Sequence, residues 1–101
     1  MWAQVQRLST HPGNEAEVLE VFDRLRAIEP EDSGLQQTLV LRSQSDPTEL
    51  FVVVVFESEE KARIREKDPR RQAGLQPIRA MLGDVLDGPP EFTDCDVVLS
   101  R

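Results

Sequence analysis

Two glutamines near the N-terminus are the polar side chains best spaced to act together on a small molecule. Gln4 and Gln6 lie two residues apart in a segment that alternates like a strand, so both share one face with Trp2. Each amide can accept and donate hydrogen bonds, which suits it to orient a substrate carbonyl or hydroxyl group. The two amides could instead bond to each other, to Gln36 or Gln37, or to water near an open sheet end. A buried amide without a partner costs about 1–3 kcal/mol, so one of these arrangements is required if the face is covered.

Two aromatic residues and one arginine could complete such a site. Trp2 and Phe22 could stack on a planar aromatic molecule, although aromatic side chains at these spacings are also typical of an ordinary core. Arg65 could hold an anionic or phenolate group, or stabilise a reduced oxygen species by its charge. The surrounding run KARIREKDPRR also fits a solvated helix face with ion pairs to Glu60 and Glu66.

The familiar catalytic and metal-binding motifs are missing from the sequence. Cys95 is the only cysteine and His11 the only histidine, which excludes an intrachain disulfide and a zinc site of standard spacing. His11 belongs to a His-Pro-Gly turn and is expected to be exposed, whereas Cys95 is expected to be a small buried residue. No Gly-rich phosphate loop or nucleophile elbow is present. We therefore expect neither a metal nor a cofactor.

The composition predicts a single domain, residues 1–101, that is soluble and cytoplasmic. Hydrophobic residues make up 39% of the chain, and no apolar run approaches the roughly 20 residues that cross a bilayer. The N-terminal residues lack the apolar core of a signal peptide. The chain carries 12 basic and 19 acidic residues, a net charge of -7 that would repel nucleic acid. We expect neither a membrane nor a nucleic-acid partner.

Hydrophobic periodicity predicts the elements of the first third of the chain. A strand is expected over residues 2–9, and the turn at residues 11–13 ends it. Asn14 is expected to cap a helix with Glu17 as its capping-box partner, and Pro30 should end that helix.

The rest of the chain predicts a hairpin, a divided helix and a last strand. The hairpin strands are residues 34–43 and 50–56, and the last strand is residues 92–100. Ser58 should cap the second helix, which Asp68-Pro69 interrupts and restarts. The order β-α-β-β-α-β predicts a ferredoxin-like α+β fold, with a four-stranded antiparallel sheet and both helices on one face.

The strand over residues 50–56 predicts a homodimer. All seven of its residues are apolar, so both of its faces should be buried. Helices would cover only one face, and the same sheet of a second copy is the simplest cover for the other. Burying several Val or Leu side chains at about 1.5–3 kcal/mol each would drive that pairing. We predict an obligate homodimer with face-to-face sheets.

Three segments resemble a known family. They are the Pro12-Gly13 turn, SGLQQTLVLRSQSDPTE, and FVVVVFESEEKAR, in which Phe56 takes the place of a usual tryptophan. In order and spacing, nearly the whole chain resembles the antibiotic biosynthesis monooxygenase family of the dimeric α/β-barrel superfamily. The resemblance implies a substrate cavity between sheet and helices. It also implies that Gln6, and with it Gln4 and Trp2, faces that cavity.

The haem-degrading branch of this family is typified by a different set of residues. That pattern has asparagine on the first strand, tryptophan on the second helix and a later haem-ligating histidine, and these positions fall on Gln6, Arg65 and Leu75. Leucine cannot ligate iron, so haem degradation is disfavoured. The oxygenase members also tend to carry histidines near the second helix, where this chain has Arg65 and Arg70.

Two functions are compatible with these residues. The first is a cofactor-independent monooxygenase that acts on a small aromatic or polyketide-like substrate, bound by Trp2, Gln4, Gln6, Phe22 and Arg65. The second is a non-catalytic homodimeric module of the same fold that binds a small molecule or a protein. An open cavity that brings Gln6 and Arg65 together favours the enzyme, and a cavity filled by Phe22, Leu75 and Ile78 favours the module.

Overall fold

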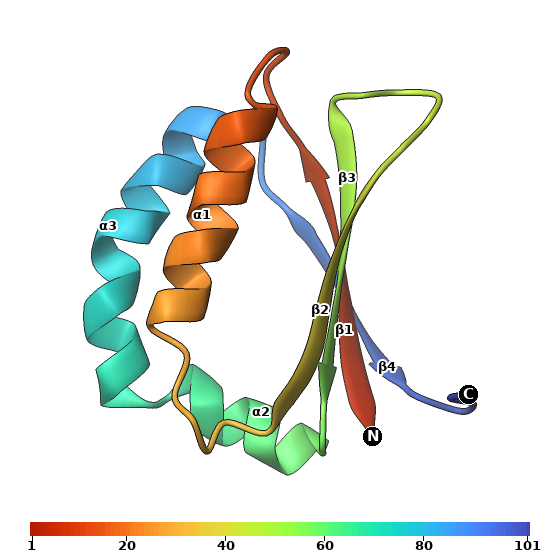
Figure 1. Ribbon diagram of the computed structural model, residues 1–101, viewed down its shortest axis with the longest axis vertical. Helices are drawn as coiled ribbons and strands as arrows, with labels where there is room; N and C mark the ends of the chain where they lie inside the picture. The colour runs from red at the N-terminus through yellow and green to blue at the C-terminus, as the bar shows by residue number, and fades with distance from the viewer.

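Two layers make up the fold, a sheet and a layer of helices (Figure 1). The computed structural model describes residues 1–101. Four strands form one antiparallel sheet in the order β2-β3-β1-β4: β1 (Trp2–Ser9), β2 (Leu35–Arg42), β3 (Glu49–Phe56) and β4 (Glu91–Asp96). Helices α1 (Glu15–Ala27) and α3 (Pro69–Val85) lie side by side over one face, and α2 (Glu59–Glu66) lies at one end of the sheet. The predicted ferredoxin-like α+β fold is confirmed. None of the helices is both long and apolar enough to span a membrane.

The predicted break between the second and third helices is confirmed. The side chain of Ser58 accepts a hydrogen bond from the backbone of Lys61 at 3.2 Å and caps α2. The side chain of Asp68 accepts one from the backbone of Arg70 at 2.9 Å and caps α3, with Pro69 in its first turn. A proline is tolerated there because the first backbone N–H groups of a helix have no partner within it.

The capping predicted for α1 is wrong. Asn14 precedes the helix, but its side chain makes no capping hydrogen bond. Its backbone, with φ −96° and ψ 17°, is outside the extended region that N-cap residues usually adopt. The helix also ends at Ala27, before Pro30.

The last strand is shorter than predicted. It pairs with β1 from Glu91, opposite Arg7, to Asp96, opposite Trp2. Because β1 begins at Trp2, the residues after Asp96 have no further strand to pair with. Val98 is 93% exposed in this terminal segment.

The two faces of β3 differ in their surroundings. Leu50, Val52, Val54 and Phe56 are buried on the side of the helices. The residues between them point to the other side of the sheet, which no element covers (Figure 1). We call this side the outer face; its apolar residues are Ala3, Val5, Leu39, Leu41, Phe51, Val53 and Val55. The homodimer that would cover it stays a prediction.

Helices α1 and α3 approach each other closely at Gly74. A Cβ atom at this position would lie 2.6 Å from Cγ2 and 3.1 Å from Cβ of Ile28, which follows α1. These atoms are near the backbone, so the neighbour cannot swing away.

We expect Gly74→Ala to destabilise the fold by about 1–3 kcal/mol because it overpacks this contact. Gly83→Ala, in the same helix, is the matched control: nothing lies within 4 Å of its added Cβ. It should stabilise the fold by about 0.5–1 kcal/mol through helix propensity. Urea unfolding measures both, and equal effects of the two variants would contradict the packing account.

Candidate functional site

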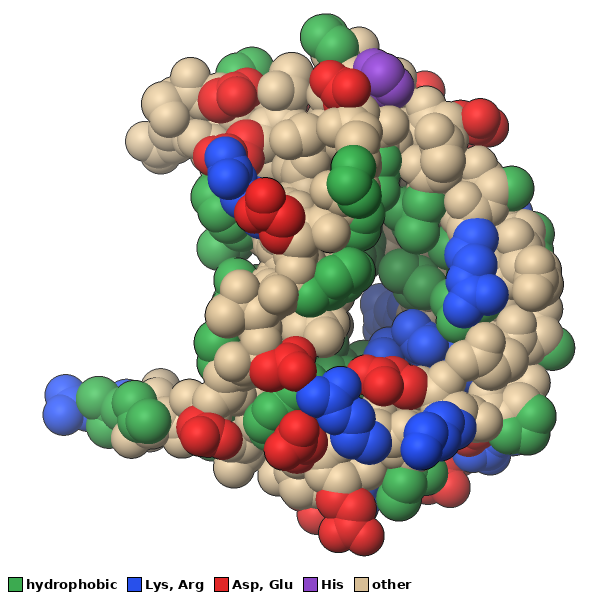
Figure 2. All heavy atoms as spheres, turned by 180° about the vertical axis from the view of Figure 1, so that it is seen from behind, with side chains coloured by type: hydrophobic (Ala, Val, Ile, Leu, Met, Phe, Trp, Pro, Cys, Tyr) green, Lys and Arg blue, Asp and Glu red, His purple; other side chains and the backbone are tan.

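A cavity of about 590 Å³ lies between the sheet and the helices. All four strands and all three helices contribute to its wall, and Figure 2 shows the hollow with Lys or Arg side chains at its depth and hydrophobic ones above them. Phe22 is part of the wall, whereas Leu75 and Ile78 are buried elsewhere and do not fill the space. The volume is within the range of small-molecule sites.

The two glutamines lie in the cavity wall and bond to each other. Gln6 Nε2 donates to Gln4 Oε1 at 3.2 Å, and Gln4 Nε2 donates to Asp94 Oδ1 at 3.2 Å. Asp94 also accepts from Arg63 Nη2 at 2.8 Å. The hydrogen bond from Arg63, and then the one from Gln4, holds the pKa of Asp94 below its usual value. Gln6 is the last residue in this series of hydrogen bonds, and its side-chain carbonyl oxygen accepts no hydrogen bond within the protein.

Arg65 also lies in the wall, tied to a carboxylate that follows α1. Its Nε and Nη2 atoms donate to the two oxygens of Glu29, both at 2.7 Å, and its guanidinium carbon lies 5.1 Å from the centre of the Phe56 ring. Both side chains of the pair are about 15% exposed or less. The solvated alternative for Arg65 is therefore wrong. On the solvated side of α2 it is Arg63 that pairs, with Glu59 and Glu66.

The pair keeps Glu29 ionised. Burial by itself would raise the pKa of Glu29, but hydrogen bonds from Arg65 and Ser33, with the charges of Arg65 and Arg71, bring that pKa below its ordinary value. A carboxylate held in this way is a weak general base. Its evident role is to fix the position of Arg65.

The two aromatic candidates separate in the structure. Phe22 reaches the cavity from α1, whereas Trp2 is absent from the wall. Trp2 is 5% exposed, and its ring centre lies 5.9 Å from that of Phe56, with the Arg63 guanidinium carbon at 5.1 Å. It is part of the core at the end of the sheet.

Sequence reasoning did not single out several wall residues. Glu29, Arg71 and Phe92 are among them. Arg71 is one of several charges in the run KARIREKDPRR, and only the start of α3 at Pro69 turns it toward the cavity side. No sequence signal separates it from Arg70, which pairs with Asp32 and Asp68.

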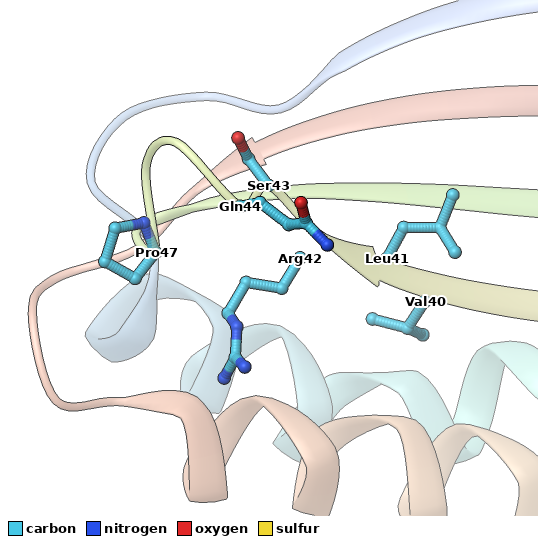
Figure 3. A pocket seen from close by; sticks show the side chains of 6 residues that line it. All are labelled: Val40, Leu41, Arg42, Ser43, Gln44 and Pro47. Carbon is cyan, nitrogen blue, oxygen red and sulfur yellow. The ribbon is translucent and has the colours of Figure 1, made fainter.

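A second hollow, of about 660 Å³, lies beside the hairpin of β2 and β3. Its six lining side chains point to different sides of the edge strand and its turn instead of converging (Figure 3). Arg42 is drawn toward α1, where it pairs with Glu15. This surface offers no grouped polar atoms to a ligand.

The other candidate residues stand apart from the cavity. His11 is exposed at its turn, and Cys95 is half-buried on the outer face opposite Ala3. No three side chains of His, Cys, Asp or Glu gather where they could hold a metal ion.

The sequence matches the family model described as antibiotic biosynthesis monooxygenase over residues 1–76. The chain belongs to this family. No curated protein matches the chain.

Solved structures share the fold of this family member. SnoaB, a cofactor-independent oxygenase from Streptomyces nogalater, is 18% identical with a TM-score of 0.76, over 98% of this chain and 94% of its own. A Caulobacter crescentus protein is 21% identical with a TM-score of 0.76, over 97% and 90%. Rv0793 from Mycobacterium tuberculosis is 16% identical with a TM-score of 0.73, over 98% and 96%. At these identities the likeness shows the fold.

We expect Glu29→Gln to destabilise the protein by about 1–3 kcal/mol at neutral pH, because it removes the charge that pairs with Arg65. The lowered pKa of Glu29 stabilises the fold above the ordinary value of 4.5, and this stabilisation is lost as the pH falls through the folded-state pKa. The difference between wild type and variant should therefore shrink in acid.

Thermal unfolding at a series of pH values measures this difference. Glu20→Gln is the control, since Glu20 pairs with Arg24 on the exposed side of α1 and should matter little at any pH. A Glu29→Gln variant as stable as wild type at neutral pH would contradict the role given to the pair.

Proposed function

We propose that this family member is a cofactor-independent monooxygenase acting on a small aromatic or polyketide-like molecule in the cavity. The open cavity itself carries the proposal: Gln6 and Arg65 both line it, and Phe22 lines it without filling it. The fold shared with SnoaB, itself a cofactor-independent oxygenase, adds support.

The reaction needs no electrons from the protein. The deprotonated, electron-rich substrate reduces O2, a C–O bond forms, and uptake of a proton gives a hydroperoxide on carbon. Loss of water then breaks the O–O bond and leaves a carbonyl group. The net change is a ring CH2 group plus O2 to C=O plus water. The protein has only to bind, orient and shield the substrate.

Different wall residues bind the substrate and stabilise the reduced oxygen. The free carbonyl oxygen of Gln6 accepts a hydrogen bond from a substrate hydroxyl, and Gln4 holds the Gln6 amide in place. Arg65 is fixed by Glu29 through Nε and Nη2, and its Nη1 group remains a hydrogen-bond donor for reduced oxygen as negative charge develops there. Because Glu29 is a weak base, the substrate must be one that loses its proton readily in water.

The probe for this proposal is 1,8-dihydroxyanthrone, with oxygen consumption followed at an electrode and oxygen-18 gas used to label the product. The wild type should accelerate oxygen uptake and place one labelled atom in the ring carbonyl. Gln6→Leu should lower kcat/KM about tenfold, because the transition state loses one hydrogen bond.

Gln76→Leu is the matched control, because Gln76 is exposed on α3 outside the cavity. It should react like wild type. Binding of the anthrone without any acceleration of oxygen uptake would contradict the enzyme and favour the non-catalytic binding module.

We also propose that two chains pair through their outer faces. Leu39 and Leu41 are 43% and 46% exposed there, beside the half-buried Phe51, Val53 and Val55. Burying such side chains contributes about 1.5–3 kcal/mol each. The cytoplasmic location expected from the sequence stays a prediction.

Leu39→Asp should turn the homodimer into a monomer, because it places a charge among the apolar side chains of the paired outer faces. Ile64→Asp is the control: Ile64 is 61% exposed on α2, which is not part of the outer face, and its replacement should leave the dimer intact. Sedimentation velocity distinguishes the two states. A monomeric wild type at high protein concentration would contradict the pairing.

A further inference from the structure

The charges of the cavity wall do not balance. Three arginines line it (Arg26, Arg65 and Arg71) against two acidic residues (Asp23 and Glu29). The wall thus carries an excess of positive charge in a chain whose net charge is -7. Asp23 and Arg26 are exposed on α1, where water screens them. The positive charge that remains unbalanced belongs to a half-buried arginine of the wall.

Arg71 is that charge. Three arginines of the chain are half-buried: Arg63, Arg65 and Arg71. Arg63 pairs with Asp94 and two glutamates, and Arg65 pairs with Glu29 through both of its donor atoms. Arg71 makes no ion pair and no side-chain hydrogen bond, although it lies close enough to Arg65 and Glu29 to feel their charges.

Leaving Arg71 in this position is costly. Burial lowers the pKa of Arg71, and the charge of Arg65 lowers it further, while Glu29 offsets only part of this effect. Glu29 is held by Arg65 through both of its oxygens and makes no hydrogen bond or ion pair with Arg71. The guanidinium stays charged nonetheless, so an anion that reaches it in the cavity would be held firmly.

The rest of the wall limits the shape of that anion. Phe22, Phe56 and Phe92 reach the cavity from a helix and two strands, and their rings favour contact with a flat aromatic molecule. A guanidinium presents a planar fork of donors that matches the two oxygens of a carboxylate. A carboxylate is already ionised at neutral pH, whereas a phenol with a pKa of about 10 must first lose its proton.

We propose that Arg71 anchors the carboxylate of an aromatic acid bound in the cavity. This names a substrate class for the site and rests on the proposed function only in calling the ligand a substrate. Arg65 remains with Glu29, and Arg71 alone receives the acid group.

Isothermal titration calorimetry tests the anchor with 2-naphthoate and its neutral analogue, 2-naphthamide. The wild type should bind the acid about tenfold or more tightly than the amide at low salt, as expected for a charge-assisted hydrogen bond. Arg71→Gln should lose this preference, and Arg71→Lys should keep part of it because the charge remains without the fork.

Arg24→Gln is the control, since Arg24 is exposed on α1 and lies outside the cavity; it should behave like wild type. Circular dichroism confirms that each variant is folded. The proposal is overturned if the wild type does not bind 2-naphthoate, if it binds acid and amide alike, or if Arg71→Gln keeps the preference.

The same variants separate this inference from the proposed function. Arg71-dependent binding of the acid in a protein that oxygenates no phenol would overturn the monooxygenase and retain the anchor. Equal oxygenation of anthrone by wild type and Arg71→Gln, with no preference for the acid, would retain the monooxygenase and overturn the anchor.

Discussion

The ion pair between Arg65 and Glu29 is the interaction on which the candidate site depends. It joins helix α2 to the segment that follows α1, so it fixes one end of the space between helices and sheet. It also decides the electrostatics of that space. The charges of Arg65 and Glu29 offset each other. Arg71, the other half-buried arginine in the cavity wall, is left without an ion-pair partner. A pair of this kind is costly to desolvate and worth keeping only when its geometry is good, as it is here.

The sheet serves a different purpose on each face. Toward the helices, Leu50, Val52 and Phe56 build a core, while the amides of Gln4 and Gln6 interrupt it and leave room for a ligand. On the outer face the same strands present apolar side chains without cover. Each amide donates one hydrogen bond, Gln6 to Gln4 and Gln4 to Asp94, and no fully buried side-chain nitrogen or oxygen atom lacks a partner.

Much of this fold could be predicted from the sequence because it depends on local signals. Ser58 and Asp68-Pro69 mark helix starts that the backbone itself requires. The alternation around Gln6 places it on one face with Gln4 and Trp2, and the family resemblance implied that this face is toward the helices, where the cavity lies. The end of β4 could not be predicted, since it is set by where β1 begins. The roles of the arginines were equally hidden. Arg63 has local partners at helical spacing, Glu59 and Glu66, but only the tertiary position of Glu29 decides that Arg65 is paired and Arg71 is not.

The most direct test of the account is a crystal structure of the protein with 2-naphthoate bound. The account predicts the ring inside the cavity between sheet and helices, in contact with Phe22, with its carboxylate on Arg71 and with Arg65 still bonded to Glu29. A probe seated on the outer face, or a cavity closed by Phe22 with the acid elsewhere, would contradict it.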